Sequence, residues 1–116
     1  MSSSFRTLHS FEKRKGDSKK VREKYPDRIP IIIEKNPKSQ LPALHQIKFL
    51  VPQNLTAKDV LYIIRKRIKL NHSDAIYIFI NNSIPPSGAL LSILYDQHKD
   101  DDGFLYITYT GENTFG

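Results

Sequence analysis

The fold is decided by one stretch of the sequence, which reads Thr56-Ala57-Lys58-Asp59-Val60-Leu61-Tyr62-Ile63-Ile64-Arg65-Lys66-Arg67-Ile68-Lys69. Thr56 is the expected N-cap, and Asp59 stands three residues later, where a capping box needs a side-chain acceptor. Val60, Ile64 and Ile68 recur at helical spacing. The cations of the last turn suit the negative end of the helix dipole. The stretch therefore predicts one well-capped amphipathic helix over residues 57–69, whose apolar face has to be covered.

Four short apolar runs bounded by Pro, Asn or Gly predict the strands that cover this helix. They lie at residues 29–33, 47–51, 76–80 and 104–109. Residues 11–24 predict a surface helix with Ser10 as N-cap, and a shorter helix ends near His98. The order is helix, strand, strand, helix, strand, helix, strand. This order predicts an α+β fold with a four-stranded mixed sheet crossed by one main helix, most economically a β-grasp, and the N-terminal helix on the opposite face.

The run at 47–51 alternates, and it stops at Pro52, which cannot donate to a neighbouring strand. Alternation sends Lys48 and Leu50 to one face and Ile47, Phe49 and Val51 to the other. Each side of this strand carries at least one large apolar residue. We therefore expect both faces of the sheet to be covered here.

The composition excludes several classes of protein. With 116 residues the chain has room for a single core, and with no Cys it has no disulfide, no Cys-ligated metal, no thiol nucleophile and no Cys-linked lipid. Its longest apolar stretches, 29–33 and 90–95, fall far short of the roughly 20 residues of a membrane-spanning helix. The first residues lack the apolar core of a signal peptide. These features predict a single soluble, intracellular domain without an encoded membrane anchor.

Neither catalysis nor a cofactor is expected. The four histidines, His9, His45, His72 and His98, match no metal-ligand spacing. The chain has no phosphate-binding loop, dinucleotide fingerprint or nucleophile elbow. We expect a protein that is not an enzyme, with no catalytic residues, metal or cofactor.

The charge is divided between the two parts of the chain. Residues 1–69 hold 17 of the 18 Lys and Arg and 6 of the 12 acids, a net of +11, whereas residues 70–116 have a net of −5. The run at 65–69 resembles the footprint of a polyanion-binding surface, but it also has a structural explanation at a helix C-terminus. Because no RNA-recognition signature accompanies it, nucleic acid is not expected as a partner. A basic β-grasp domain that binds RNA or another polyanion remains the alternative.

A series of short motifs, in order and correctly spaced, resembles one family. They are Phe11-Glu12-Lys13-Arg14, Tyr25-Pro26-Asp27-Arg28 with Pro30 and Glu34-Lys35, Leu50-Val51-Pro52 with Leu55-Thr56, Ile64-Arg65-Lys66-Arg67-Ile68, Asn81-Asn82, Leu94-Tyr95, Asp102-Gly103-Phe104-Leu105-Tyr106 and Phe115-Gly116. Together they resemble the autophagy ubiquitin-like modifiers, relatives of GABA type A receptor-associated protein and of microtubule-associated light chain three. The resemblance covers residues 11–116. It implies a ubiquitin-like β-grasp with two N-terminal helices, divided into an extension at 1–28, a core at 29–110 and a flexible conjugation tail at 111–116.

The resemblance also implies a function. Such proteins are joined through a C-terminal glycine, here Gly116 with Phe115 as a tail-recognition residue, to phosphatidylethanolamine on autophagosomal membranes. The implied partners are activating and conjugating enzymes, a processing and delipidating cysteine protease, and cargo receptors with aromatic-x-x-aliphatic motifs. The implied location is cytoplasmic when the protein is free and the autophagosome membrane when it is lipidated.

Two receptor pockets follow from the resemblance, one on each face of the strand at 47–51. The residues matched to the aromatic pocket are Asp17, Val21, Pro30, Ile32, Lys48, Leu50 and Phe104. Those matched to the aliphatic pocket are Phe49, Val51, Pro52, Leu55, Val60 and Ile63, and those matched to contacts with acidic flanks are Arg28, Lys48 and Arg67. An extended peptide pairing with this strand would reach both pockets.

Three positions depart from the family pattern. Ser10 replaces a common Pro, Gln46 a common basic residue and Val60 a common aromatic residue. We expect Val60 to leave a roomier aliphatic pocket, and Gln46 to weaken the preference for acidic flanks.

Overall fold

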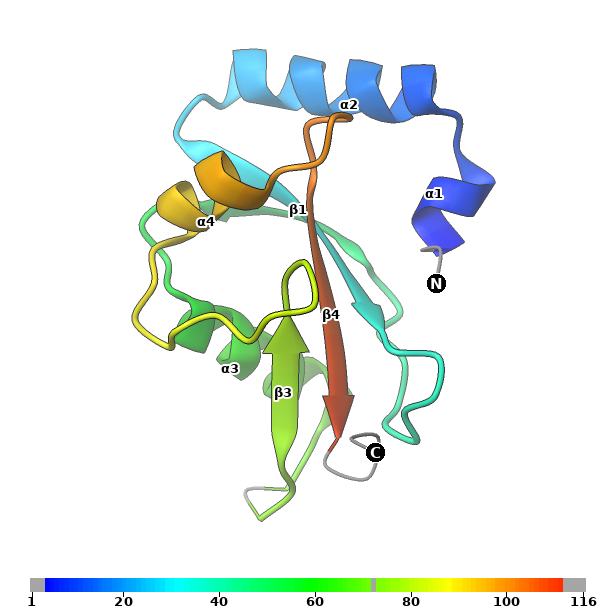
Figure 1. The fold of residues 1–116 in the computed structure, drawn as a ribbon, viewed down its shortest axis with the longest axis vertical. Coiled ribbons are helices and arrows are strands. Elements are labelled where there is room, and N and C mark those ends of the chain that lie inside the picture. Colours follow the sequence, from blue (N-terminus) through cyan, green and yellow to red (C-terminus); the bar gives the residue numbers. More distant parts are fainter. Residues whose placement is uncertain (1–3, 72, 112–116) are drawn as a thin grey trace.

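The computed structural model describes residues 4–71 and 73–111 and shows four helices and four strands in this part of the chain (Figure 1). In chain order they are α1 (Ser4–Leu8), α2 (Phe11–Lys24), β1 (Arg28–Lys35), β2 (Lys48–Pro52), α3 (Ala57–Ile68), β3 (Ile76–Phe79), α4 (Leu91–His98) and β4 (Leu105–Gly111). The sheet order is β2-β1-β4-β3, with β1 parallel to β4 and the other two pairs antiparallel. The predicted mixed four-stranded β-grasp is confirmed.

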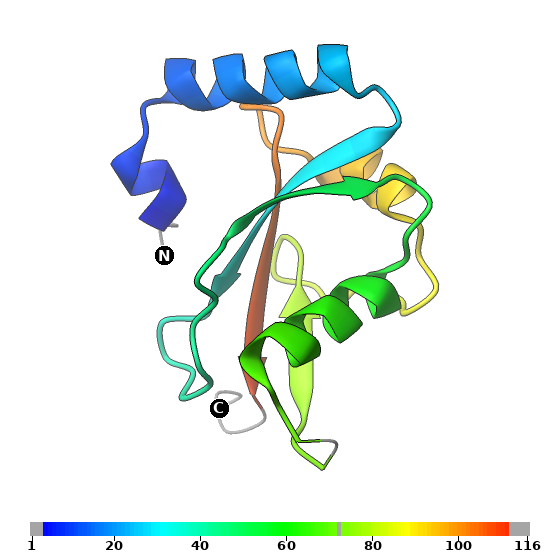
Figure 2. The same cartoon turned by 180° about the vertical axis from the view of Figure 1, so that it is seen from behind.

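The main helix forms as its sequence predicts. Thr56 accepts a hydrogen bond from the Asp59 N–H, and the Asp59 side chain accepts from the Thr56 N–H, so the capping box is complete. The side chains of Val60, Ile64 and Ile68 are buried in the larger core cluster. Figure 2 shows α3 crossing one face of the sheet.

A second, smaller cluster lies on the opposite face. The side chains of Ile31 and Ile33 in β1 join the α3 side, and Ile32 between them packs with Phe5 and Phe104. Phe5 comes from the five-residue helix α1 and is its buried residue. The prediction of two N-terminal helices opposite the main helix is confirmed (Figure 1).

A buried carboxylate attaches α2 to the turn before β4. Asp102 has no exposed side-chain surface, and its Oδ2 lies 2.6 Å from Arg14 Nη1 and 2.5 Å from the Tyr106 hydroxyl, which donates to it. The Ser18 hydroxyl donates to the Asp102 carbonyl. Burial and the bond to Asp102 together raise the pKa of Tyr106 to about 12. Because each partner comes from α2 or from the segment around β4, the network orients α2 on the sheet.

Several boundaries differ from the sequence prediction. Ile80 lies outside β3 and bridges Ser83 across Asn81 and Asn82, whose φ values of 50° and 65° form a tight turn. Ile47 precedes β2 and packs against the smaller cluster, so its predicted place on the Phe49 face is wrong; regular pairing begins only at Lys48. The sheet extends one residue beyond each end of the predicted core at 29–110.

Candidate functional site: a free strand edge between two surfaces

β2 is an edge strand, and no other strand of the described residues pairs with its outer side. The Ile33 N–H donates to the Ile47 carbonyl and the Gln53 N–H donates to the Asp27 carbonyl, which fixes which residues of β2 point their backbone toward β1. By alternation, the backbone N–H and C=O groups of Phe49 and Val51 point toward β1. Those of Lys48 and Leu50 point away from the sheet. Because Pro52 has no N–H, it cannot donate a hydrogen bond to a strand added at this edge. The geometry suits the addition of a short extended peptide at Lys48 and Leu50.

One surface beside this edge contains the residues matched to the aromatic pocket. Pro30 pairs with Leu50 and Ile32 pairs with Lys48, so the four side chains share one face of the sheet. Asp17 and Val21 stand one turn apart on α2, which packs on β1. Ile32 and Phe104 meet in the smaller core cluster. The structure thus brings six of the seven predicted residues to the α2 side of β1 and β2, and only Val21 is placed solely by its position on α2.

Part of this surface is covered by residues that the sequence did not assign to it. Phe5 packs edge-on against Phe104, with ring centroids 5.4 Å apart. The side chains of Ile32 and Phe104 are 0% exposed and Phe5 is 5% exposed. A ligand ring can therefore contact Ile32 or Phe104 only if a neighbouring side chain moves.

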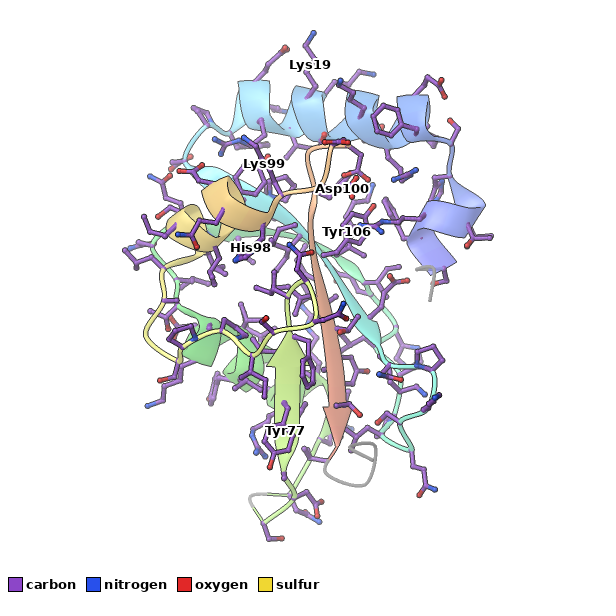
Figure 3. The ribbon with its side chains drawn as sticks, viewed as in Figure 1. Lys19, Tyr77, His98, Lys99, Asp100 and Tyr106 are labelled. Atoms are coloured by element: carbon purple, nitrogen blue, oxygen red, sulfur yellow. The ribbon has the colours of Figure 1, made fainter. Side chains whose placement is uncertain are left out.

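α1 is held in this position by polar contacts at several of its residues. The Ser4 hydroxyl donates to Glu34 Oε2 at 2.5 Å, and Arg6 Nη2 lies 2.8 Å from Asp100 Oδ1. The Arg6 guanidinium also stacks over the Tyr106 ring, 3.9 Å from its centroid. Tyr106 and Asp100 lie on the side of the sheet that carries α1 and α2 (Figure 3). Phe5 was missed as a site residue because its Ser-rich surroundings predict little structure.

Three charged side chains lie close together on the same surface. Lys48 Nζ lies 3.9 Å from Asp17 Oδ2, and Lys13 Nζ lies 3.8 Å from the same atom. Both lysines are more than half exposed, so each pair is weak and easily exchanged for a ligand group. Asp17 keeps exposed carboxylate surface that a donor of an incoming peptide could reach.

The other surface lies between β2 and α3. Phe49 and Val51 are 7% and 6% exposed, and Leu55 and Ile63 are partly buried against the same core. Val60 has no exposed surface, so it lies beneath the surface as core. Its contribution to ligand binding is then limited to the space that its small side chain leaves.

The predicted cations flank both surfaces. Arg28 is exposed at the start of β1, opposite Pro52. The Arg67 guanidinium lies 5.2 Å from the Phe49 ring centroid and donates to Gln46 Oε1 at 3.3 Å. Lys66 Nζ stands 5.9 Å from the Tyr62 ring centroid. The cationic end of α3 is thus engaged in local contacts, which favours its structural explanation over a polyanion-binding surface.

Gln46 makes a contact that the sequence did not predict. Its side-chain amide donates to the Lys48 carbonyl at 2.8 Å. That carbonyl is one of the outward-pointing acceptors of β2 described above. Gln46 therefore occupies a position that an added peptide strand would use.

A cavity of about 600 Å³ lies elsewhere, beneath α1 and beside the β1–β2 loop. Its lining includes Glu34, Ile47, Asn82 and Tyr106, and contains no residue of either predicted pocket.

Other expectations concern different parts of the chain. Phe115 and Gly116 lie outside the described residues. Within residues 4–71 and 73–111 no group of three His, Cys, Asp or Glu is arranged to hold a metal ion. The same residues contain no helix with the length and apolar character needed to cross a bilayer.

Comparisons with known proteins agree on one family. The family model described as autophagy protein Atg8 ubiquitin like matches residues 13–116. "Autophagy-related protein 8" of Schizosaccharomyces pombe is 57% identical over 116 residues, which is 100% of this chain and 96% of that protein. "Autophagy-related protein 8e" of Arabidopsis thaliana is 55% identical over 97% of this chain and 92% of its own length. The crystal structure of Trypanosoma brucei ATG8 superposes with a TM-score of 0.93 at 43% identity, covering 100% of both chains.

Proposed function

Because this chain belongs to the Atg8 family of ubiquitin-like autophagy proteins, we propose that it is joined through Gly116 to phosphatidylethanolamine on autophagic membranes and there recruits cargo receptors. The family supports the general role of a ubiquitin-like modifier in autophagy. To this role the proposal adds the lipid, the membrane location and the two-pocket receptor site. It also adds the partner enzymes, which are the activating and conjugating enzymes and a cysteine protease that reverses the linkage.

The free edge of β2 is the observation that carries the receptor site. Lys48 and Leu50 present backbone groups outward, and their side chains face the α2 surface. The side chains of Phe49 and Val51 face α3. An extended peptide with an aromatic residue and, three positions later, an aliphatic residue can pair with this edge and direct one anchor to each side. A four-residue anchor buries little area, so we expect affinities of roughly micromolar Kd.

Titration of an aromatic-x-x-leucine peptide tests the receptor site. Leu50→Ala removes half-buried side-chain surface on the aromatic side and should weaken binding by on the order of 1 kcal/mol or more. Tyr62→Ala, which removes an exposed side chain of α3 that is not among the predicted pocket residues, is the control. Equal affinities of Leu50→Ala and the unmodified protein would remove Leu50 from the site.

Conjugation at Gly116 is supported by the family match, which extends through residue 116. A glycine can enter narrow enzyme sites because it has no side chain. The test is reconstitution with cognate activating and conjugating enzymes on phosphatidylethanolamine vesicles, followed by intact mass. Gly116→Ala should form no lipid conjugate, and Gly88→Ala, where an added Cβ meets nothing within 4 Å, should conjugate normally. Normal conjugation of Gly116→Ala contradicts the proposal.

A further inference from the structure

The last described residues of β4 are hydrogen-bonded to the loop that joins β1 to β2. β1 pairs with β4 only as far as Lys35 and Tyr109. Beyond that point the Asn36 N–H donates to the Tyr109 carbonyl at 2.8 Å, and the Tyr109 hydroxyl donates to the Pro42 carbonyl at 2.7 Å. The loop and the end of β4 lie side by side in both views (Figures 1 and 2). The loop therefore continues to follow β4 after regular pairing has ended.

Two residues of this loop reach Gly111 itself. The Gly111 N–H donates to Ser39 Oγ over a long 3.4 Å, and Ser39 is only 5% exposed. A Cβ on Gly111 would stand 3.4 Å from Leu41 Cγ, and Leu41 packs against the main core. On its other side Gly111 pairs with Ile76 of β3. Gly111 is thus held between β3 and the loop.

We propose that Ser39, Leu41 and Tyr109 form a tail guide, a set of positioning residues that fixes where residues 112–116 leave the domain. This rests on the proposed conjugation through Gly116. Gly116 is five positions beyond Gly111 in the sequence, and five extended residues span at most about 18 Å. With so short a reach, the place and direction of Gly111 decide how often Gly116 enters an enzyme site while the domain is docked.

Loosening the guide should slow transfer without weakening docking. If Thr110 and Gly111 are freed, they have to be ordered again each time the tail enters the enzyme, and fixing one backbone residue corresponds to roughly a fivefold or larger factor. The surfaces that dock the domain are unchanged. The expected signature is a lower kcat at an unchanged KM.

The test compares Ser39→Ala combined with Tyr109→Phe against Gln40→Ala. Both variants alter side chains that belong to the β1–β2 loop or bond to it, but Gln40 is exposed and lies between Ser39 and Leu41. In thioester formation with cognate enzymes, the double variant should lose about fivefold in kcat with KM within twofold of the unmodified protein. Amide hydrogen exchange at Gly111 should accelerate in the double variant and stay unchanged in Gln40→Ala.

The outcomes separate the two proposals. If the unmodified protein forms no thioester, conjugation and the guide are both overturned. If it forms the thioester and the double variant has the same kcat, the guide alone is overturned. A change in KM alone also overturns the guide, because it indicates altered docking. Should the double variant not fold, Tyr109→Phe alone keeps the ring in the core, and the same lower kcat is expected of it.

Discussion

The ring of Phe5 stands edge-on against the ring of Phe104, with centroids 5.4 Å apart and planes inclined by 74°. The two residues come from opposite ends of the described chain, one from α1 and the other from the segment before β4. Phe104 is matched to the aromatic pocket by family resemblance, and Phe5 covers it. α1 thus contributes its own aromatic ring to the surface proposed for a receptor's aromatic residue.

Phe5→Ala should strengthen the binding of an aromatic-x-x-leucine peptide. Removing the ring exposes Phe104 and Ile32, and the ligand ring then no longer has to displace a buried neighbour. We expect a gain of about threefold to tenfold in affinity, which corresponds to roughly the free energy of one aromatic pair. Calorimetric titration measures the gain, and Phe11→Ala, which removes a 40% exposed ring on α2, should change little. Weaker binding by Phe5→Ala would show that Phe5 supports the pocket.

Gln46→Ala should also strengthen peptide binding. The Gln46 side-chain NH2 donates a hydrogen bond to the Lys48 carbonyl, and the side-chain oxygen of Gln46 accepts one from Arg67. The substitution frees an edge acceptor for the peptide backbone and a cation for an acidic flank. Since one hydrogen bond contributes about 0.5–1.5 kcal/mol net, a gain of roughly twofold to tenfold is expected in the same titration. Gln53→Ala, which alters another exposed glutamine, is the control, and equal affinities of the two variants would refute the competition.

Two glycine substitutions should change stability in opposite directions. At Gly103, with φ of +90°, an added Cβ would stand 2.3 Å from Ser18 Oγ, so Gly103→Ala should lower the free energy of unfolding by about 1–3 kcal/mol. At Gly16, inside α2, nothing lies within 4 Å of the added Cβ. Gly16→Ala should therefore raise the free energy of unfolding by about 0.5–1 kcal/mol. Urea titration measures both, and a shift of equal sign in the two variants contradicts this account.

Alkaline pH should destabilise the fold partly through Tyr106. The pKa of Tyr106 is raised to about 12 in the folded protein, by burial first and by its bond to Asp102 second. Between the ordinary tyrosine pKa near 10 and this value, the unfolded chain loses a proton that the folded protein retains. Stability from this group is therefore complete below pH of about 10 and is lost as the pH rises toward 12.

Tyr106→Phe isolates this contribution. Urea unfolding at pH of about 9 and about 11.5 should show a smaller alkaline loss of unfolding free energy in the variant than in the unmodified protein. The pKa values of Tyr95 and Tyr109 are also raised by burial, and both residues are present in the two proteins, so their effects cancel. Identical losses in the two proteins would show that Tyr106 does not titrate differently on folding.

Much of the fold could be predicted because its local signals are strong. Thr56 and Asp59 form the capping box that their spacing predicts. The alternation of residues 48–51 placed the side chains of Phe49 and Val51 toward α3. Alternation failed at Ile47, because a residue before the paired part of the strand is positioned by neighbouring packing and not by a partner strand.

The sequence by itself determined the elements, their order and the family, because caps, turns and apolar periods act within a few residues of one another. The tertiary structure alone decided which distant residues meet. Phe5 covers Phe104, and Asp102 pairs with Arg14 of α2. Ser39 and Leu41 of the β1–β2 loop contact Gly111. Such contacts depend on how the helices and strands pack, and no local pattern encodes them. The free edge of β2 belongs to both levels, since its alternation is visible in the sequence and its unpaired outer side exists only once the sheet has formed.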